Sequence, residues 1–140
     1  MHRLFFTIKA FITAAVIIGC LIFVYLILNS PVFMGGERYE FYTGTSSEEI
    51  VLARSPLEKL TLKNLTGESV RYRGDRVEEL LSRFGAEVLF IEEAAGVMNY
   101  YCYSPVLKEA VILNGQLINL HIALSCDTTA AGTPIIFGGF

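Results

Sequence analysis

Three residues in the last 40 positions have the types needed for nucleophilic catalysis: Cys102, His121 and Asp127. A thiol nucleophile needs a base beside it, and that base needs a third group to orient it. The three residues follow no motif spacing, and His121 lies in an alternating segment where a hydrogen-bonded structural histidine is the common role. We therefore expect no catalysis. The alternative, an envelope enzyme that uses Cys102 or His121, requires a pocket that joins their side chains.

Cys102 and Cys126 form a second candidate arrangement, because both lie in segments with strand character. A disulfide requires their α-carbons to lie within about 7 Å, so the spacing leaves open a bridge or two separate half-buried thiols. The chain has no Cys-x-x-Cys or His-x-x-x-His pair, and we expect no metal site. The glycine pairs at 35–36 and 138–139 lack the context of a phosphate-binding loop, so no cofactor is expected.

Acidic and aromatic residues offer two further possibilities. Glu92 and Glu93 are adjacent, so in a strand their carboxylates point to opposite faces and cannot form the facing pair of a glycosidase. The tyrosines at 100, 101 and 103 fit either a recognition surface or ordinary sheet packing. From the residues expected on a polar sheet face we select three as a candidate binding surface: Tyr101, Asn119 and His121.

The N-terminal segment predicts on which side of a membrane these residues lie. Ala10 to Leu28 contains no charge, and as a helix it spans roughly 28 Å, close to the hydrocarbon thickness of a bilayer. Arg3 and Lys9 precede it and no basic residue follows until Arg38, which places the N-terminus inside. We expect a cytoplasmic segment at 1–9, a transmembrane helix at 10–29, a linker at 30–36 with a flexible joint at its two glycines, and an extracytoplasmic domain at 37–140.

Two other kinds of N-terminal segment also contain an apolar stretch. A cleaved signal peptide usually has an apolar region of about 7 to 15 residues followed by a small-residue cleavage site, and neither property is present. A lipoprotein signal is suggested by the letters Ile17-Ile18-Gly19-Cys20, but the residues after Cys20 are apolar rather than a polar tether. A single-pass anchor with an unmodified membrane cysteine is the preferred interpretation.

Charge argues against a nucleic-acid partner. The net charge is −3, and the part after Pro31 holds 14 acidic and 9 basic residues. Because neutralisation of phosphates supplies most of the affinity for nucleic acid, an acidic domain is a poor binder. The one basic cluster, at Arg71, Arg73 and Arg76, is offset by acidic neighbours and is interpreted as a solvated surface.

The outer domain combines one helix with several strands. Apolar residues at helical spacing predict a helix from Arg76 to Phe84, which Asp75 and Glu78 would cap and Gly85 would end. Strands are expected at 38–43, 50–53, 59–62, 69–73, 86–91, 97–103, 110–113, 116–125 and 133–137. In the segment 116–125, Asn119, His121, Ala123 and Ser125 alternate with apolar residues and are expected to face water or a partner. The fold class is α+β: the helix is followed by four or five antiparallel strands, which gives a small antiparallel sheet packed on one main helix as a two-layer sandwich.

The C-terminal half resembles a known family in two places. The stretch Asn119-Leu120-His121-Ile122-Ala123-Leu124, followed by Gly132-Thr133-Pro134-Ile135-Ile136, is similar to the end of the YwmB family of spore-forming Gram-positive bacteria. The helix from Arg76 and the strand around Tyr101 come in the matching order. The resemblance covers roughly the last 70 residues. It implies a sheet packed on helices, likened in shape to TATA-box-binding proteins, in an exported protein with no established catalytic residues.

These observations together predict a binding protein. We expect a membrane-anchored extracytoplasmic module, attached through residues 10–29, that binds another envelope or sporulation protein and performs no catalysis. The first alternative is a sensor or carrier that encloses a lipid or cell-wall fragment between sheet and helix. The second alternative is the cysteine- or histidine-dependent enzyme considered above.

Overall fold

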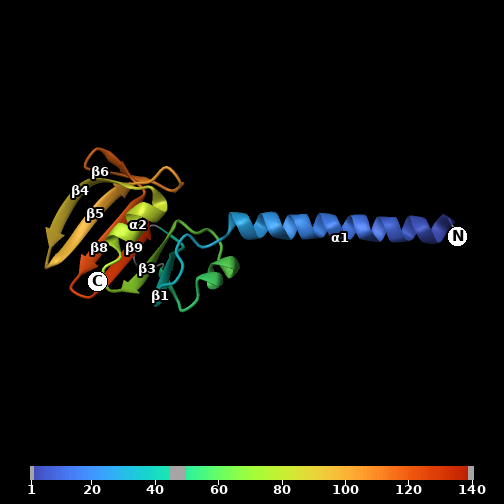
Figure 1. The fold of residues 1–140 in the computed structure, drawn as a ribbon, viewed down its shortest axis with the longest axis horizontal. Helices are drawn as coiled ribbons and strands as arrows, with labels where there is room; N and C mark the ends of the chain where they lie inside the picture. Colours follow the sequence, from blue (N-terminus) through green and yellow to red (C-terminus); the bar gives the residue numbers. More distant parts are fainter. Residues whose placement is uncertain (1, 45–49, 139–140) are drawn as a thin grey trace. The chain divides into compact units, whose positions relative to one another are not determined.

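The computed structural model describes residues 2–44 and 50–138, with side chains from Thr7 onward (Figure 1). The chain divides after Ser30 into two compact units. The first unit is the helix α1 (His2–Leu28), in which Thr7–Leu28 is long and apolar enough to cross a membrane, with a mean hydropathy of 2.9. Where the helix ends, the Tyr25 carbonyl accepts from both the backbone amide of Asn29 at 3.1 Å and its side-chain Nδ2 at 2.9 Å. The predicted N-terminal apolar helix is thereby confirmed.

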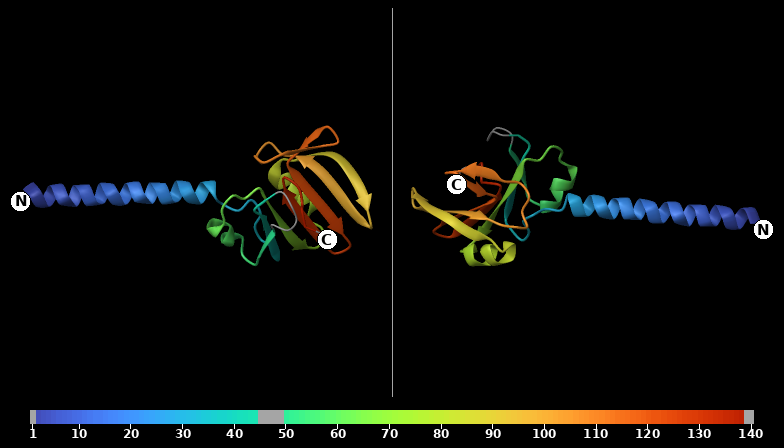
Figure 2. Two further views of the ribbon diagram at one scale, coloured as in Figure 1. Left: turned by 180° about the vertical axis from the view of Figure 1, so that it is seen from behind. Right: turned by 90° about the horizontal axis from the view of Figure 1, so that it is seen from above.

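The second unit, Pro31–Phe140, is built on a seven-stranded antiparallel sheet (Figures 1 and 2). Its strand order is β2-β1-β3-β9-β8-β5-β4. The strands are β1 (Arg38–Tyr42), β2 (Ile50–Ala53), β3 (Gly67–Arg73), β4 (Glu87–Ala94), β5 (Val97–Tyr103), β8 (Leu120–Ser125) and β9 (Thr128–Thr133). Two short strands, β6 (Val111–Leu113) and β7 (Gln116–Ile118), form a separate hairpin about the two-residue turn Asn114-Gly115. The α+β class is confirmed, and the sheet is larger than expected.

The helix α2 (Val77–Phe84) supplies the apolar side chains that pack on one face of this sheet. Its buried residues Val77, Leu80 and Phe84 share a cluster with Leu120 and Ile122 of β8. Burying a large apolar side chain contributes about 1.5–3 kcal/mol, so this stripe fixes the helix to the sheet. Gly85 ends the helix in the left-handed conformation, as predicted.

The start of α2 differs from the expected capping box. The N-cap is Arg76, which makes no side-chain cap, although the Oδ1 of Asp75 accepts from the Val77 amide at 2.9 Å. The Arg76 amide donates to the Thr129 hydroxyl of β9 at 2.9 Å. The helix therefore begins one residue later than predicted and is tied directly to the sheet.

The C-terminal segment 134–138 covers part of the second face of the sheet, at His121 and Tyr42. The Ile136 amide donates to His121 Nδ1 at 3.3 Å, and the Phe137 amide donates to the Tyr42 hydroxyl at 3.2 Å. A Cβ at Gly132 would lie 2.8 Å from Ile136 Cγ1 and 3.0 Å from the backbone of Ile135, so a larger residue there would force this segment to shift. The segment buries His121, which the sequence indicated to lie on an open face.

Three of the predicted strands were wrong. The segment 59–62 lies mostly in a 3-10 helix, Pro56–Thr61, because Ser55 and Glu58 form a capping box around Pro56. The segment 116–125 is two strands interrupted at Asn119, whose amide bonds to the Cys102 carbonyl. The last strand is β9 rather than 133–137, since Pro134 has no amide to donate to a ladder. Strand β9, which completes the seven, was missed altogether.

The expected flexible joint at Gly35-Gly36 was also wrong, because the segment before β1 is packed into the domain. The Val32 amide donates to the Glu68 carboxylate, and Phe33 is buried with 1% exposure. The Gly36 amide donates to the Tyr39 hydroxyl at 2.8 Å, and a side chain at Gly36 would meet the Arg71 carbonyl at 2.9 Å. Residues 32–36 are therefore part of the fold rather than a tether.

Candidate functional site

The structure does not bring the three nucleophile candidates together. Cys102 and His121 lie on neighbouring strands, but Cys102 belongs to the core on the α2 face whereas His121 hydrogen-bonds to the segment on the other face. Asp127 lies in the turn between β8 and β9, where its carbonyl accepts from the Gly74 amide at 2.8 Å. Burial raises the pKa of the Cys102 thiol to about 12, so the thiolate is scarce at neutral pH. These residues form no nucleophilic triad.

His121 is a buried structural residue with two hydrogen bonds. The Nδ1 atom accepts from the Ile136 amide, so the neutral ring carries its proton on Nε2 and donates to Asn99 Oδ1 at 3.1 Å. The ring stacks on Tyr101 with centroids 4.5 Å apart, and Tyr101 stacks in turn on Phe90 at 4.5 Å. Burial lowers the pKa of His121 to about 4. The prediction that His121 lies on an open face was wrong: it is 7% exposed.

Asn119 was also placed on an open face by the sequence, and it too is buried, with 1% exposure. Its Oδ1 accepts from the Ser104 amide at 2.6 Å, while its Nδ2 donates to the carbonyls of Ser104 and Leu107 at 2.7 and 3.1 Å. The side chain thus stands in for a missing strand partner at the break between β7 and β8. Of the three selected residues, only Tyr101 keeps partial exposure.

The cysteines are free thiols: Cys102 is buried and Cys126 is exposed. The disulfide that the sequence left open is absent. Among residues 2–44 and 50–138, no group of three His, Cys, Asp or Glu residues is arranged to hold a metal ion.

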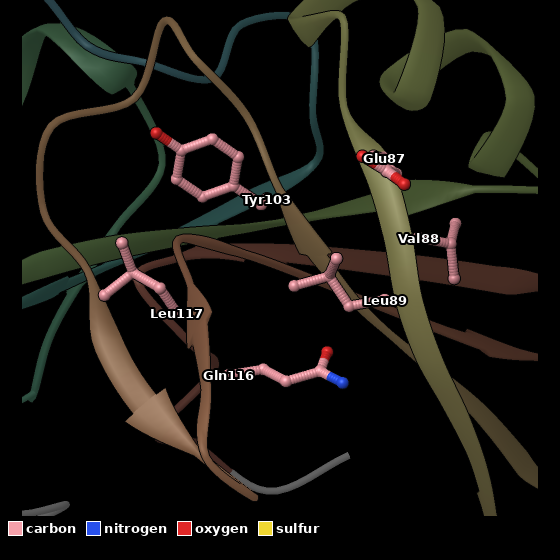
Figure 3. A pocket seen from close by; sticks show the side chains of 6 residues that line it. All are labelled: Glu87, Val88, Leu89, Tyr103, Gln116 and Leu117. Carbon is pink, nitrogen blue, oxygen red and sulfur yellow. The ribbon is translucent and has the colours of Figure 1, made fainter.

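An open groove lies where the sheet edge meets the β6–β7 hairpin (Figure 3). It has a volume of about 510 Å³ and is lined by Glu87, Val88, Leu89, Tyr103, Gln116 and Leu117. Figure 3 shows Leu89 pointing from β4 toward Tyr103 and Leu117, while Val88 points the other way. The walls are therefore apolar, with a carboxylate and an amide at the margin.

Apolar side chains continue from this groove onto the surface around it. Ile112 is 75% exposed and Leu117, its cross-strand partner in the hairpin, is 48% exposed. Tyr103, which also lines the groove, is exposed as well. Contiguous exposed apolar residues on a folded domain commonly mark a binding site. This surface was not predicted from the sequence, although the apolar residues flanking a two-residue turn were a signal that could have located it.

The β4 strand beside the groove is an edge of the sheet. Its exposed carboxylates, Glu87, Glu92 and Glu93, make no ion pair within the described part of the chain. The register between β4 and β5 shifts at a bulge between Val88 and Phe90. The result is an acidic, irregular edge next to an apolar groove.

Comparison of the chain with protein-family models, with curated proteins and with solved structures gives no match.

Proposed function

We propose that this protein is a membrane-anchored binding module whose recognition surface is the groove between β4 and the β6–β7 hairpin. The observation that carries the proposal is the exposure of Ile112 and Leu117 beside an apolar groove of about 510 Å³. Exposure of these side chains to water does not stabilise the monomer. A partner that covers them would stabilise the complex by about 25 cal/mol per Å² of apolar surface buried. Binding is therefore the function this geometry supports best.

The location of the module is part of the proposal. The helix α1 is a candidate span, and the basic residues Arg3 and Lys9 before it favour a cytoplasmic N-terminus. The domain after Pro31 would then lie outside the cytoplasm, anchored by one pass. The similarity of the segment 119–136 to the YwmB family supports an envelope partner in a sporulating bacterium.

Photo-cross-linking in cells tests the proposal on the full chain. A photoreactive amino acid in place of Leu117 is expected to yield one abundant adduct with an envelope protein, because Leu117 lines the groove. The matched control is the same amino acid in place of Leu52, which is 58% exposed on β2 at the opposite edge of the sheet. The adduct is expected only from position 117 and is expected to vanish in an Ile112→Asp background. Equal adducts from both positions, or none from position 117, would overturn the proposal.

A further inference from the structure

Charge is divided unevenly between the two parts of the outer domain. Residues 31–85 include nine acidic and eight basic residues. Beyond residue 85 there are five carboxylates and one lysine: Glu87, Glu92, Glu93, Glu109, Asp127 and Lys108. Nearly all the excess negative charge therefore belongs to the part of the chain that contributes the groove.

The bulge in β4 controls where two of these carboxylates point. In a regular strand, residues five apart lie on opposite faces. The extra residue between Val88 and Phe90 changes this, so that Glu87 pairs with Tyr103 and Glu92 pairs with Asn99, two residues of β5 that share a face. Glu93 pairs with Met98 and lies on the other face.

The spacing of the two carboxylates follows from this register. Tyr103 and Asn99 are four residues apart on β5, which corresponds to about 13 Å along a strand. Phe90, opposite Tyr101, lies between them on the same face. The groove adjoins the Glu87 end of this row, since Glu87 and Tyr103 both line it. The face thus presents two negative charges, an aromatic residue between them and an apolar groove at one end.

We propose that this edge of the sheet receives an extended, positively charged polypeptide segment of an envelope protein. Basic side chains at positions i and i+4 of the segment pair with Glu87 and Glu92, and an apolar side chain at the Glu87 end enters the groove. The inference rests on the proposed function and specifies its partner. In an extended chain, positions i and i+4 share a face and lie about 13 Å apart, which matches the carboxylate spacing.

A second copy of this chain is a poorer occupant of the same edge. Two β4 strands brought together would oppose carboxylate-rich edges, and like charges across a strand pair are unfavourable. The bulge further limits regular pairing between two identical edges. Both features select against self-association and leave the edge available to a partner of opposite charge.

Peptide binding to the full chain in lipid nanodiscs tests the inference. The probe is a fluorescent nine-residue peptide with lysines at positions 3 and 7, valines at 1, 5 and 9, and serines elsewhere, followed by anisotropy. We expect Glu87→Gln and Glu92→Gln each to weaken binding about threefold, and the double variant about tenfold. The Glu93→Gln variant is the matched control, since it removes the same charge from the other face of the same strand. It is expected to change the dissociation constant less than twofold.

Two control peptides sharpen the result. One carries its lysines at positions 3 and 6, which point to opposite faces of an extended chain. The other carries glutamates in place of the lysines. Both should bind more weakly than the peptide with lysines at positions 3 and 7. Equal losses in the Glu92→Gln and Glu93→Gln variants would overturn the face assignment. If no lysine peptide binds but the cross-link from position 117 still captures a partner, the inference fails and the proposed function survives. If both fail, the groove is not a recognition site.

Discussion

The rings of Phe33 and Phe84 meet edge to face, with centroids 5.6 Å apart and planes at 78°. Phe33 lies five residues beyond the last residue of α1, and Phe84 is the last residue of α2. Their contact means that the segment leaving the apolar helix is packed into the core of the domain. The carbonyl of Val32 accepts from Arg83 at 3.4 Å and adds a second tie to the same helix end.

Truncating Phe33 should therefore destabilise the domain, although the residue precedes every strand. We expect Phe33→Ala to lower the free energy of unfolding by about 3–5 kcal/mol, the usual loss for a buried phenylalanine. Denaturant unfolding of the full chain in detergent measures this change. Met34→Ala is the control because Met34 is 48% exposed, and it should cost less than about 1 kcal/mol. Similar losses in both variants would show that Phe33 is not buried in solution.

Glu68 connects this segment to the 3-10 helix. One carboxylate oxygen accepts from the Val32 amide, and the other lies 2.9 Å from Lys59 Nζ, with both side chains largely buried. Glu68→Gln keeps the size but removes the charge that faces Lys59, so we expect a loss of about 3 kcal/mol. Glu78→Gln, on the exposed side of α2, is the matched control.

A double-mutant cycle separates the ion pair from the rest of the Glu68 site. If Lys59→Met and Glu68→Gln are coupled, the double variant should lose less stability than the two single losses added together. Additive losses would contradict the pairing.

The cysteines lead to a prediction about reactivity. Cys126 is exposed, whereas Cys102 is buried with its pKa raised by desolvation. An alkylating reagent applied to the native protein at pH 8 should modify Cys126 and leave Cys102 unmodified until the domain unfolds. Mass spectrometry of the digested protein identifies the labelled residue. Recovery of a disulfide-linked peptide containing both cysteines would contradict this arrangement.

Local patterns in the sequence predicted the elements better than the arrangement of their faces. The alternation in 116–125 correctly placed Ile118, Leu120 and Ile122 in the core. It failed for Asn119 and His121, because alternation does not show which other parts of the chain cover a polar residue. His121 is covered by the segment around Ile136, whose irregular path has no periodic pattern, whereas Asn119 is buried in hydrogen bonds to Ser104 and Leu107.

The groove could not be predicted from the sequence for a related reason. Its position depends on the bulge near Leu89, which reverses the facing of every later residue in β4. No periodic pattern in the segment 86–91 indicates this register shift. The acidic residues were visible as a charge excess, but only the register shows that Glu87 and Glu92 share a face.

His121 gives a prediction about pH. Its pKa is lowered by burial to about 4, whereas an unfolded histidine titrates near 6.5. Stability from the neutral ring is therefore fully present above pH 6.5 and is lost as the pH falls through the window toward 4. The loss is at most about 3 kcal/mol, and less if the segment 134–138 opens and admits water. Protonation also removes the acceptor for the Ile136 amide, so this segment should be the first to loosen.

The His121→Gln variant isolates this effect from the titration of carboxylates. Glutamine keeps a donor and an acceptor but does not titrate, so the difference in unfolding free energy between the two proteins should shift in favour of the variant between pH 6.5 and 4. The protection factor of the Ile136 amide, which corrects for slower intrinsic exchange at low pH, should fall over the same window in the wild type and stay higher in the variant, because only the imidazole loses its acceptor. Parallel stability curves from pH 7 to 4 would mean that His121 is already hydrated in the folded protein, and the segment 134–138 would then not seal the second face of the sheet at His121.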